Sequence, residues 1–177
     1  MKKCTTYTIG KTTIKKTPDY DPDTSYLGEY GRVLKPGCII RINESFYEDL
    51  PDDYDKDDHE IRGEYPYFYP PDNGEKPGTE DYKKYALQDY HLMEDLNNQQ
   101  WSYIGITVTT KIYTDMGISD EITNSLWGIE DHCDKDSRDY HNEVIDDLKS
   151  ENKAELLKMG FTEKEIDESL NNADEVD

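Results

Sequence analysis

Four acidic residues between Asp53 and Glu64 have the spacing of a calcium-binding loop. Asp53, Asp55, Asp57 and Glu64 stand at loop positions one, three, five and twelve, where carboxylate oxygens ligate Ca²⁺. The sixth position is Asp58, whereas the sharp turn of such a loop needs glycine. A proline on each side also leaves the segment without the two flanking helices of an EF-hand. We therefore interpret the segment as a solvated acidic loop that binds cations only weakly.

Other residues with catalytic or metal-binding chemistry do not combine into a known site. His132, Cys133 and His141 are of zinc-ligating types, but they lack a fourth ligand and a standard zinc spacing. The sequence has no Gly-x-Ser-x-Gly elbow, phosphate-binding loop or His-Glu-x-x-His motif. With 41 acidic residues, close carboxylate pairs arise by chance, so no catalytic dyad is inferred. We expect no cofactor, no metal and no enzymatic activity; an enzyme of an unrecognised type is an alternative.

The strongest signal is charge. The 177 residues contain 41 acidic and 20 basic side chains, a net charge of −21. Residues 1–17 carry +5, so residues 18–177 carry −26. A negative field of this size opposes direct binding to nucleic acid and to anionic membranes. It favours basic partners, including the basic grooves that proteins use to hold nucleic acid.

The acidity is densest in residues 43–60, which contain nine acidic residues, one base and a proline. We expect an exposed, mobile loop whose carboxylates stand in for phosphates, while tyrosines supply contact area. The predicted partner-binding residues are Glu44, Glu48, Asp49, Asp52, Asp53, Asp55, Asp57, Asp58, Glu60, Tyr47 and Tyr54.

One long stretch with two-residue alternation, residues 101–130, predicts the hairpin at the centre of a sheet. Ile104, Ile106, Val108 and Ile112 fall on one face, and Tyr103, Thr107, Thr109 and Lys111 fall on the other. Residues 115–117 read as the turn, with Gly117 supplying a positive φ. The returning strand is expected to place Ile118, Ile122 and Leu126 on its buried face.

Two helical regions accompany the hairpin. Thr79 is a suitable N-cap for a helix of residues 79–97, with an apolar stripe of Tyr82, Tyr85, Ala86, Met93 and Leu96. Residues 137–171 form the helical C-terminal end. Its expected features are an N-cap at Ser137, a C-cap at Gly160, a capping box from Thr162 to Glu165, and a staple between Phe161 and Ile166.

Weaker signals predict the remaining strands and the domain organisation. Residues 4–16 read as a short hairpin around Gly10-Lys11, and residues 64–69 as a strand that Pro66 confines to an edge or a bulge. The fold class is α+β: a mostly antiparallel sheet centred on residues 101–130, one inserted helix and a helical C-terminal end. We expect a single domain of residues 1–171, followed by a frayed acidic tail of residues 172–177.

Cysteine usage and hydropathy bear on the compartment. Three widely spaced cysteines indicate neither a disulfide framework nor a zinc ribbon. No segment has the length and apolarity of a membrane span. We therefore expect a protein of the reducing cytoplasm.

Four short segments carry a wider resemblance. They are Ser25-Tyr-Leu-Gly-Glu-Tyr30, Tyr85-Ala-Leu-Gln-Asp-Tyr90, Trp101-Ser-Tyr-Ile-Gly-Ile106 and Ser125-Leu-Trp-Gly-Ile-Glu130. In these segments the chain resembles a family of small acidic proteins encoded by bacteriophages and other mobile elements. The resemblance implies a mobile-element origin and the cytoplasm of a host cell, but no assigned chemistry. By analogy it implies an inhibitor of host defence, such as a DNA mimic or an anti-CRISPR protein.

Charge and resemblance together predict a non-enzymatic protein that binds a basic host protein. The partner expected is the nucleic-acid groove of a host defence nuclease complex, with no direct contact to nucleic acid or membrane. The alternative is an accessory or structural phage protein whose acidity serves only solubility.

Overall fold

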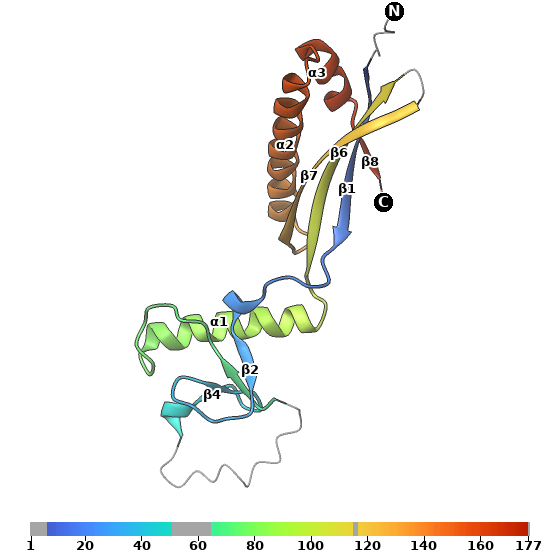
Figure 1. The fold of residues 1–177 in the computed structure, drawn as a ribbon. Coiled ribbons are helices and arrows are strands. Elements are labelled where there is room, and N and C mark those ends of the chain that lie inside the picture. The colour runs from blue at the N-terminus through green and yellow to red at the C-terminus, as the bar shows by residue number, and fades with distance from the viewer. Residues whose placement is uncertain (1–6, 51–64, 115–116, 177) are drawn as a thin grey trace, which may run out of the picture. The chain divides into compact units, whose positions relative to one another are not determined.

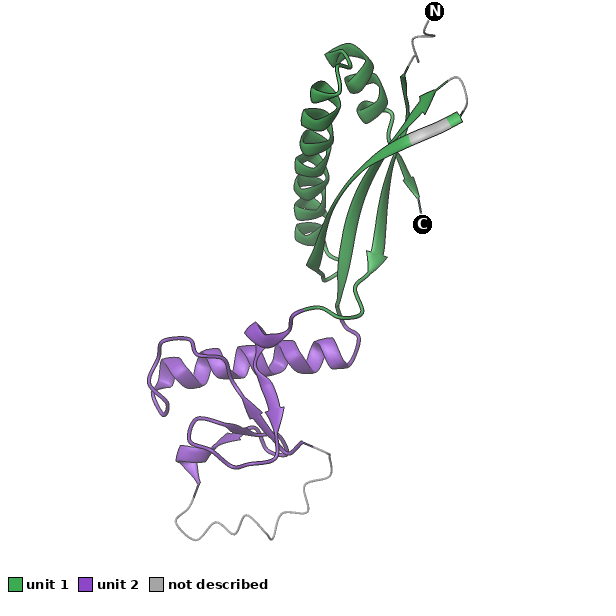
Figure 2. Cartoon of the chain, in the orientation of Figure 1, with its two compact units in different colours: residues 1–22, 101–177 green, residues 23–100 purple. Residues whose placement is uncertain are grey.

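The chain forms two compact units. The computed structural model describes residues 7–50, 65–114 and 117–176 (Figure 1). Unit 1 comprises residues 1–22 and 101–177, and unit 2 comprises residues 23–100, as Figure 2 shows. Each unit combines a four-stranded sheet with helices, so the fold class is α+β as predicted. Where the sequence analysis expects one domain, unit 2 is an insertion within the sequence of unit 1.

The sheet of unit 1 is built on the predicted hairpin. Its strands are β1 (Thr8–Pro18), β6 (Ser102–Thr114), β7 (Gly117–Asp131) and β8 (Asp174–Val176), in the spatial order β7-β6-β1-β8. The hairpin strands β6 and β7 pair antiparallel, and β1 pairs antiparallel with β6. The strand β8 adds in parallel beside β1. Residues 174–176, expected in a frayed tail, are therefore part of the sheet, and Lys11 forms an ion pair with Asp174.

The predicted hairpin within residues 4–16 is wrong, because β1 runs through it as one strand. The register with β6 passes from Ile9 opposite Ile112 to Thr12 opposite Thr110, so one extra residue bulges out at Gly10-Lys11. A Cβ on Gly10 would lie 2.0 Å from the ring of Tyr113, which explains glycine at this point. The Gly-Lys pair that resembled a turn is thus a bulge.

The predicted faces of β6 are confirmed. Ile106, Val108 and Ile112 are fully buried, whereas Thr107 and Thr109 are half-buried on the opposite face. Figure 1 shows the helices α2 (Lys135–Lys158) and α3 (Glu163–Asn171) on one face of the sheet. The apolar face of the hairpin is buried beneath these helices, which is the usual arrangement of an α+β layer pair.

The returning strand departs from simple alternation. Ile122 is buried as expected, but Leu126 is 44% exposed. Ile104 pairs with Ile129 and Ile106 with Leu126, so β7 has an extra residue at Trp127-Gly128 opposite Gly105. Gly128 has a φ of +74°, which glycine adopts without strain. This bulge shifts the alternation and places Ile129 in the core.

The helix ends of unit 1 follow the expected capping chemistry with two corrections. The C-cap of α2 is Met159 and not Gly160, which follows it with a φ of +94°. The capping box of α3 is present, because Thr162 and Glu165 exchange side-chain to backbone hydrogen bonds. Phe161 packs against the apolar cluster that contains Ile166. The N-cap of α2 is Asp134 and not Ser137. Asp134 accepts a 2.8 Å hydrogen bond from the Ser137 backbone N–H, and an aspartate satisfies this role as well as a serine.

A buried polar layer divides the core of unit 1. The amide nitrogen of Asn152 donates to Thr110 Oγ1 at 3.2 Å, and Asn152 Oδ1 accepts from the Asn124 side chain at 2.6 Å. Thr110 and Thr12 hydroxyls are 2.9 Å apart, and Thr12 meets the Ser169 hydroxyl at 2.8 Å. Apolar clusters lie on each side of this layer. One contains Ile14, Ile104, Ile106, Val108, Ile129, Val144, Ile145 and Leu148; the other contains Ile112, Ile122, Leu156, Ile166 and Leu170.

We predict that Asn152→Ala lowers the free energy of unfolding by about 2–3 kcal/mol, because it leaves buried hydrogen-bonding groups without their partner. The matched control is Asn142→Ala in the same helix, where the side chain is exposed and the expected change is within about 0.5 kcal/mol. Urea titration of both variants measures the difference. Equal losses would mean that the layer contributes no more than an exposed amide.

Unit 2 pairs short strands with one helix. Its strands are β2 (Glu29–Gly31), β3 (Ile39–Ile40), β4 (Ser45–Phe46) and β5 (Tyr67–Tyr69), in the antiparallel order β2-β5-β3-β4. Two 3₁₀ turns, η1 (Ser25–Leu27) and η2 (Tyr47–Asp49), and the helix α1 (Glu80–Asn97) complete it. Pro66 does not place β5 on an edge, because the strand begins after it and is central. The Pro66 carbonyl accepts a 3.1 Å hydrogen bond from the Arg41 backbone N–H.

The helix α1 starts as predicted, with Thr79 as its N-cap. Its buried stripe is Tyr82, Ala86, Tyr90 and Met93. The expected stripe was wrong at Tyr85, which is 43% exposed, and it omitted Tyr90. The four-residue steps from Tyr82 to Tyr90 follow one face of a helix, and Tyr85 lies off that face.

Candidate interaction surface

The predicted acidic site lies in unit 2, and its described members are engaged within that unit. Glu48 accepts a 2.5 Å hydrogen bond from the Gly37 backbone N–H, and Asp49 forms a 2.5 Å ion pair with Lys83. Glu44 lies 3.3 Å from His91, and Tyr47 is 39% exposed. Residues 45–49, predicted to be part of a mobile loop, form β4 and η2. These carboxylates are therefore not an open acidic field.

The remaining predicted contact residues lie in the segment 51–64, outside the described residues. They are Asp52, Asp53, Tyr54, Asp55, Asp57, Asp58 and Glu60. The calcium-loop residue Glu64 lies in the same segment. Within the described ranges, no group of three or more His, Cys, Asp or Glu side chains is placed to hold a metal.

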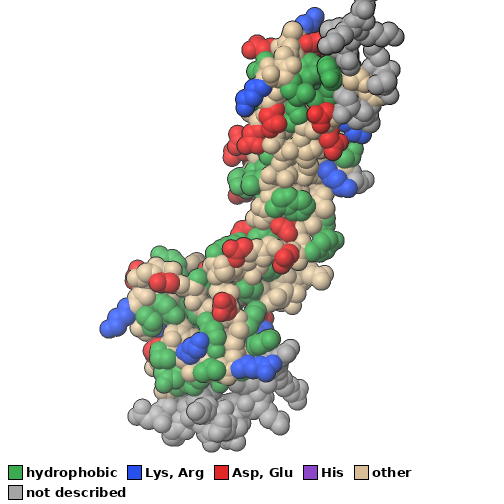
Figure 3. Space-filling view, in the orientation of Figure 1, with side chains coloured by type: hydrophobic (Ala, Val, Ile, Leu, Met, Phe, Trp, Pro, Cys, Tyr) green, Lys and Arg blue, Asp and Glu red, His purple; other side chains and the backbone are tan. Residues whose placement is uncertain are grey.

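Acidity is shared by the two units. Unit 1 contains 22 acidic and 12 basic residues, a net charge of −10, and unit 2 contains 19 and 8, a net charge of −11. Figure 3 shows Asp and Glu side chains over the visible face of both units. Either unit could therefore carry an acidic contact surface.

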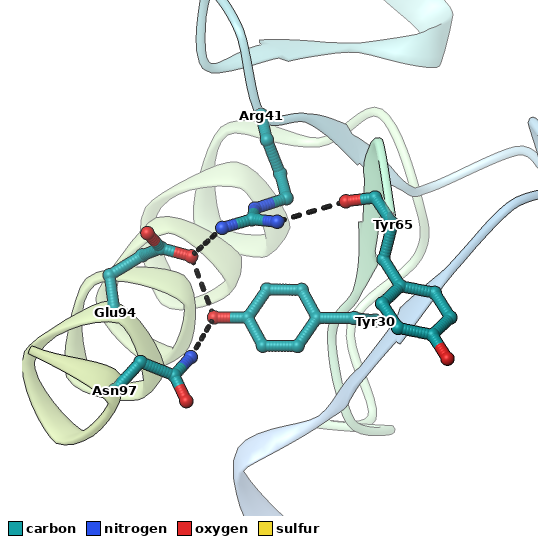
Figure 4. A network of polar contacts seen from close by, with 5 residues as sticks. All are labelled: Tyr30, Arg41, Tyr65, Glu94 and Asn97. Carbon is teal, nitrogen blue, oxygen red and sulfur yellow. Dashed lines mark hydrogen bonds and ion pairs between the residues drawn. The ribbon is translucent and has the colours of Figure 1, made fainter. Parts of the chain in front are cut away.

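The best-defined polar network of unit 2 joins α1 to the sheet (Figure 4). Arg41 forms a 2.6 Å ion pair with Glu94 and donates to the Tyr65 carbonyl at 2.9 Å. The same Glu94 oxygen accepts from the Tyr30 hydroxyl at 2.6 Å, and Asn97 donates to that hydroxyl at 2.8 Å. Two guanidinium nitrogens of Arg41, one Glu94 oxygen and the Tyr30 hydroxyl thus have partners within the network. These contacts join α1 to the sheet and favour a structural role.

Burial and the neighbouring Glu94 carboxylate raise the pKa of Tyr30 above its ordinary value. The Arg41 guanidinium, centred 4.4 Å from the Tyr30 ring, opposes this shift. Tyr30 is therefore held as a neutral hydrogen-bond donor and is not an activated phenolate.

An apolar hollow of unit 1 lies between β7 and α2. It has a volume of about 250 Å³ and is lined by Ser125, Leu126, Tyr140, Glu143, Val144, Asp147, Leu148 and Glu151. Val144 and Leu148 are buried at its floor, whereas Leu126 and Tyr140 are about half exposed. Leu126 is left uncovered because β7 is the last strand on this side of the sheet.

Acidic side chains from α2 line this hollow. Glu143, Asp147 and Glu151 follow one another at four-residue steps and therefore lie along one side of the helix. No lysine or arginine lines the hollow. Two of the basic residues of α2 form ion pairs with other carboxylates: Lys135 pairs with Asp139, and Lys153 pairs with Asp167 at 2.7 Å. The negative charge of this side is thus not neutralised from within the lining.

A second hollow of about 390 Å³ continues the first and shares Tyr140 with it. Its lining residues are Gly128, Ile129, Glu130, His132, Asp136, Ser137 and Tyr140. His132 stacks on Trp101 with ring centroids 4.9 Å apart, and its Nε2 lies 3.2 Å from Glu130. We call the two hollows together the acidic groove.

Two serines line the acidic groove. The Ser137 hydroxyl is buried and accepts a hydrogen bond from the His132 backbone N–H at 3.2 Å, and the Ser125 hydroxyl accepts one from the Trp127 indole N–H at 3.3 Å. Of the other residues considered for zinc, Cys133 is an exposed free thiol and His141 is buried in α2. The chemistry available in the groove is ionic contact, ring stacking and apolar burial.

Sequence reasoning missed the acidic groove because its walls come from β7 and α2. A signal was present in α2, where acids at positions 143, 147 and 151 run beside the apolar residues Tyr140, Val144 and Leu148. The sequence does not show, however, that Leu126 stands opposite them. That placement depends on the packing of α2 against β7 and on the position of β7 at the edge of the sheet.

Comparison of the chain with protein-family models, curated proteins and solved structures finds no match. None of the described helices has the length and hydropathy needed to cross a membrane.

Proposed function

We propose that the chain is a non-enzymatic acidic protein that binds a basic surface of a partner protein through the acidic groove of unit 1. The observation that supports this most is the combination of the half-exposed apolar side chains of Leu126 and Tyr140 with an acidic rim whose lining residues include no lysine or arginine. Rim carboxylates steer and orient a basic partner, and the desolvated floor supplies affinity.

A role of the charge in solubility alone does not account for the floor of the groove. Solubility is served by charges on any exposed surface. Leu126, Trp127 and Tyr140 are instead 44%, 50% and 50% exposed, and the first and last line the groove. Exposed apolar groups rimmed by polar ones are typical of interaction sites.

The same proposal extends to the kind of partner. A groove that holds nucleic acid presents arginine and lysine side chains, which form charge-assisted hydrogen bonds with carboxylates as well as with phosphates. We therefore propose a nucleic-acid-binding protein as the partner and, following the resemblance to mobile-element proteins, a defence complex of the host cell.

We expect the immobilised protein to capture nucleic-acid-binding proteins from a bacterial lysate and double-stranded DNA to displace them. Because the contact is ionic, capture should fall by at least about tenfold when the salt concentration rises from about 0.05 to 0.2 M. Quantitative mass spectrometry of the bound fraction measures both effects.

The matched control carries Glu143→Gln, Asp147→Asn and Glu151→Gln, which remove the rim charge from exposed positions of α2. It is expected to capture the same proteins at least about tenfold less well. The proposal would be refuted if neither salt nor DNA reduces the capture. It would also be refuted if the immobilised protein captures no more protein than an inert resin does.

A further inference from the structure

The outer edge of β7 carries no partner strand within the described part of the chain. On its inner edge, β7 forms seven consecutive regular pairs with β6, from Ile106 opposite Leu126 to Ile112 opposite Asp120. A regular strand directs every second backbone N–H and C=O away from its partner. Residues 120–126 therefore present a continuous row of backbone donors and acceptors beside the acidic groove.

The middle of this edge lacks the features that normally prevent strand addition. Natural edges are protected by lysines, prolines, bulges or inward charges. Residues 122–126, Ile-Thr-Asn-Ser-Leu, have none of these. The charges lie at the two ends of β7, at Asp120, Glu121, Glu130 and Asp131, and all of them are negative. The middle of the edge can therefore pair with an added strand, and the negative charges at the two ends of β7 favour an added strand that is basic.

The geometry of the acidic rim matches an extended chain. Along α2, four residues advance about 6 Å, which is the axial step between Glu143, Asp147 and Glu151. Along a β-strand, two residues advance about 6.7 Å, and residues two apart point to the same face. A strand paired with β7 would therefore direct every second side chain toward the α2 side, at steps close to those of the carboxylates.

We propose that β7 accepts an extended segment of a partner protein that carries Lys or Arg at alternate positions around one apolar residue. The segment adds to the sheet beside β7; its apolar side chain enters the hollow on Leu126, Val144 and Leu148, and its basic side chains meet the acidic rim. This inference rests on the proposed function and specifies the form of the partner, since backbone pairing gives affinity and alternate side chains give selectivity.

A second copy of the chain is a poor occupant of the same edge. Antiparallel pairing of two β7 strands would bring two equally acidic rims to the same side of one continuous sheet. The residues Glu143, Asp147 and Glu151 of each copy would then repel those of the other, without a base in either lining. Charge complementarity thus favours a basic segment over self-association.

The test uses a synthetic peptide in which lysine alternates with threonine and the central lysine is replaced by leucine. A fluorescent label on the peptide reports its binding by anisotropy. We expect the full-length protein to bind this peptide at least about tenfold more tightly than a peptide of the same composition with its lysines contiguous.

Two N-methylated versions of the peptide test whether a backbone ladder forms. In one peptide the backbone amides of the lysines and the leucine are methylated. In the other, the backbone amides of the threonines are methylated. Only one of these two sets of N–H groups can face β7 in a ladder. We expect one methylated peptide to lose at least about tenfold in affinity and the other to bind within about threefold of the parent.

Matched variants of the protein test the rim. The rim variant is Glu143→Gln, Asp147→Asn and Glu151→Gln, and the control is Asp146→Asn, Glu168→Gln and Glu175→Gln. All six positions are exposed, so both variants should keep the fold, which circular dichroism verifies. The rim variant should bind the peptide at least about tenfold more weakly, whereas the control should lose less than about threefold through the screened general field.

Equal binding by both methylated peptides, or equal losses in the two protein variants, would overturn strand addition at β7. Strand addition and the proposed function fail separately. If the two methylated peptides bind with equal affinity while salt and DNA still reverse the capture of partners, the protein binds a basic partner but not by strand addition. Loss of that ionic capture would remove the proposed function itself.

Discussion

Replacing Ile106 with Asp is expected to unfold unit 1. Ile106 has no exposed surface and lies in the larger apolar cluster under α2. The substitution removes a buried aliphatic side chain and places a carboxylate where no base lies in the cluster. We expect a loss of at least about 4–5 kcal/mol, a large part of the 5–15 kcal/mol that stabilises a typical domain.

The adjacent residue supplies the control. Thr107→Asp introduces the same charge on the open face of β6, where the side chain is half-buried and is not covered by α2. Its expected cost is about 1 kcal/mol, mainly from the lower strand preference of aspartate. Urea titration followed by circular dichroism measures both variants. Comparable damage at 106 and 107 would show that the two faces of β6 are equally buried.

Raising the pH above about 10 is expected to destabilise unit 2, because that is where tyrosines of an unfolded chain ionise. Burial is the main cause that raises the pKa of Tyr30, Tyr82 and Tyr90 in the folded state. Nearby carboxylates add to the effect, Glu94 at Tyr30 and Tyr90 and Glu48 at Tyr82.

The direction of the effect follows from proton linkage. Below the unfolded pKa both states hold the three phenolic protons, and the stability that these groups contribute is complete. Above it the unfolded state releases protons that the folded state keeps, so stability falls as the pH rises toward the folded pKa values. Each tyrosine contributes a slope of at most about 1.4 kcal/mol per pH unit, reached only where the unfolded state is ionised and the folded state is still protonated, so the three together contribute at most about 4 kcal/mol per unit.

Urea titrations at several pH values between about 8 and 11, followed by phenolate absorbance, measure this slope. The control is Tyr90→Phe, which keeps the ring packed against Phe68, 5.4 Å away between centroids, and removes one ionising group. Its slope should be about one third smaller. A stability of unit 2 that does not change with pH across this range would contradict the burial of these hydroxyls.

The parts of the fold that the sequence predicts correctly are those specified by local chemistry. The faces of β6 follow from side-chain alternation, and the start of α1 and the capping box of α3 follow from single polar residues at helix ends. Gly117 has the predicted positive φ, +117°, whereas residues 115–116 of the predicted turn lie outside the described residues. In each case a few neighbouring residues are sufficient to determine the structure.

The missed features depend on residues that are distant in the sequence. The bulge at Gly10-Lys11 is visible only from the register of β1 against β6, and β8 finds its place beside a strand about 160 residues earlier. The candidate site was missed for the same reason, because Leu126 and Asp147 become neighbours only when α2 packs on β7. Local propensity has no access to such pairings.

The insertion of unit 2 has a consequence for the order of events during synthesis. Pro18 pairs with Ile104, and the Asp19 N–H donates to the Tyr103 carbonyl at 2.9 Å, so the inserted residues leave and rejoin unit 1 where a hairpin loop would stand. During synthesis, β1 emerges from the ribosome long before β6, so the two strands can pair only after unit 2 has been made. Residues 23–100 are contiguous and are therefore complete before the residues of unit 1 are. Because the entropy of closing a loop grows only with the logarithm of its length, this junction tolerates exchange of the whole insert for another module.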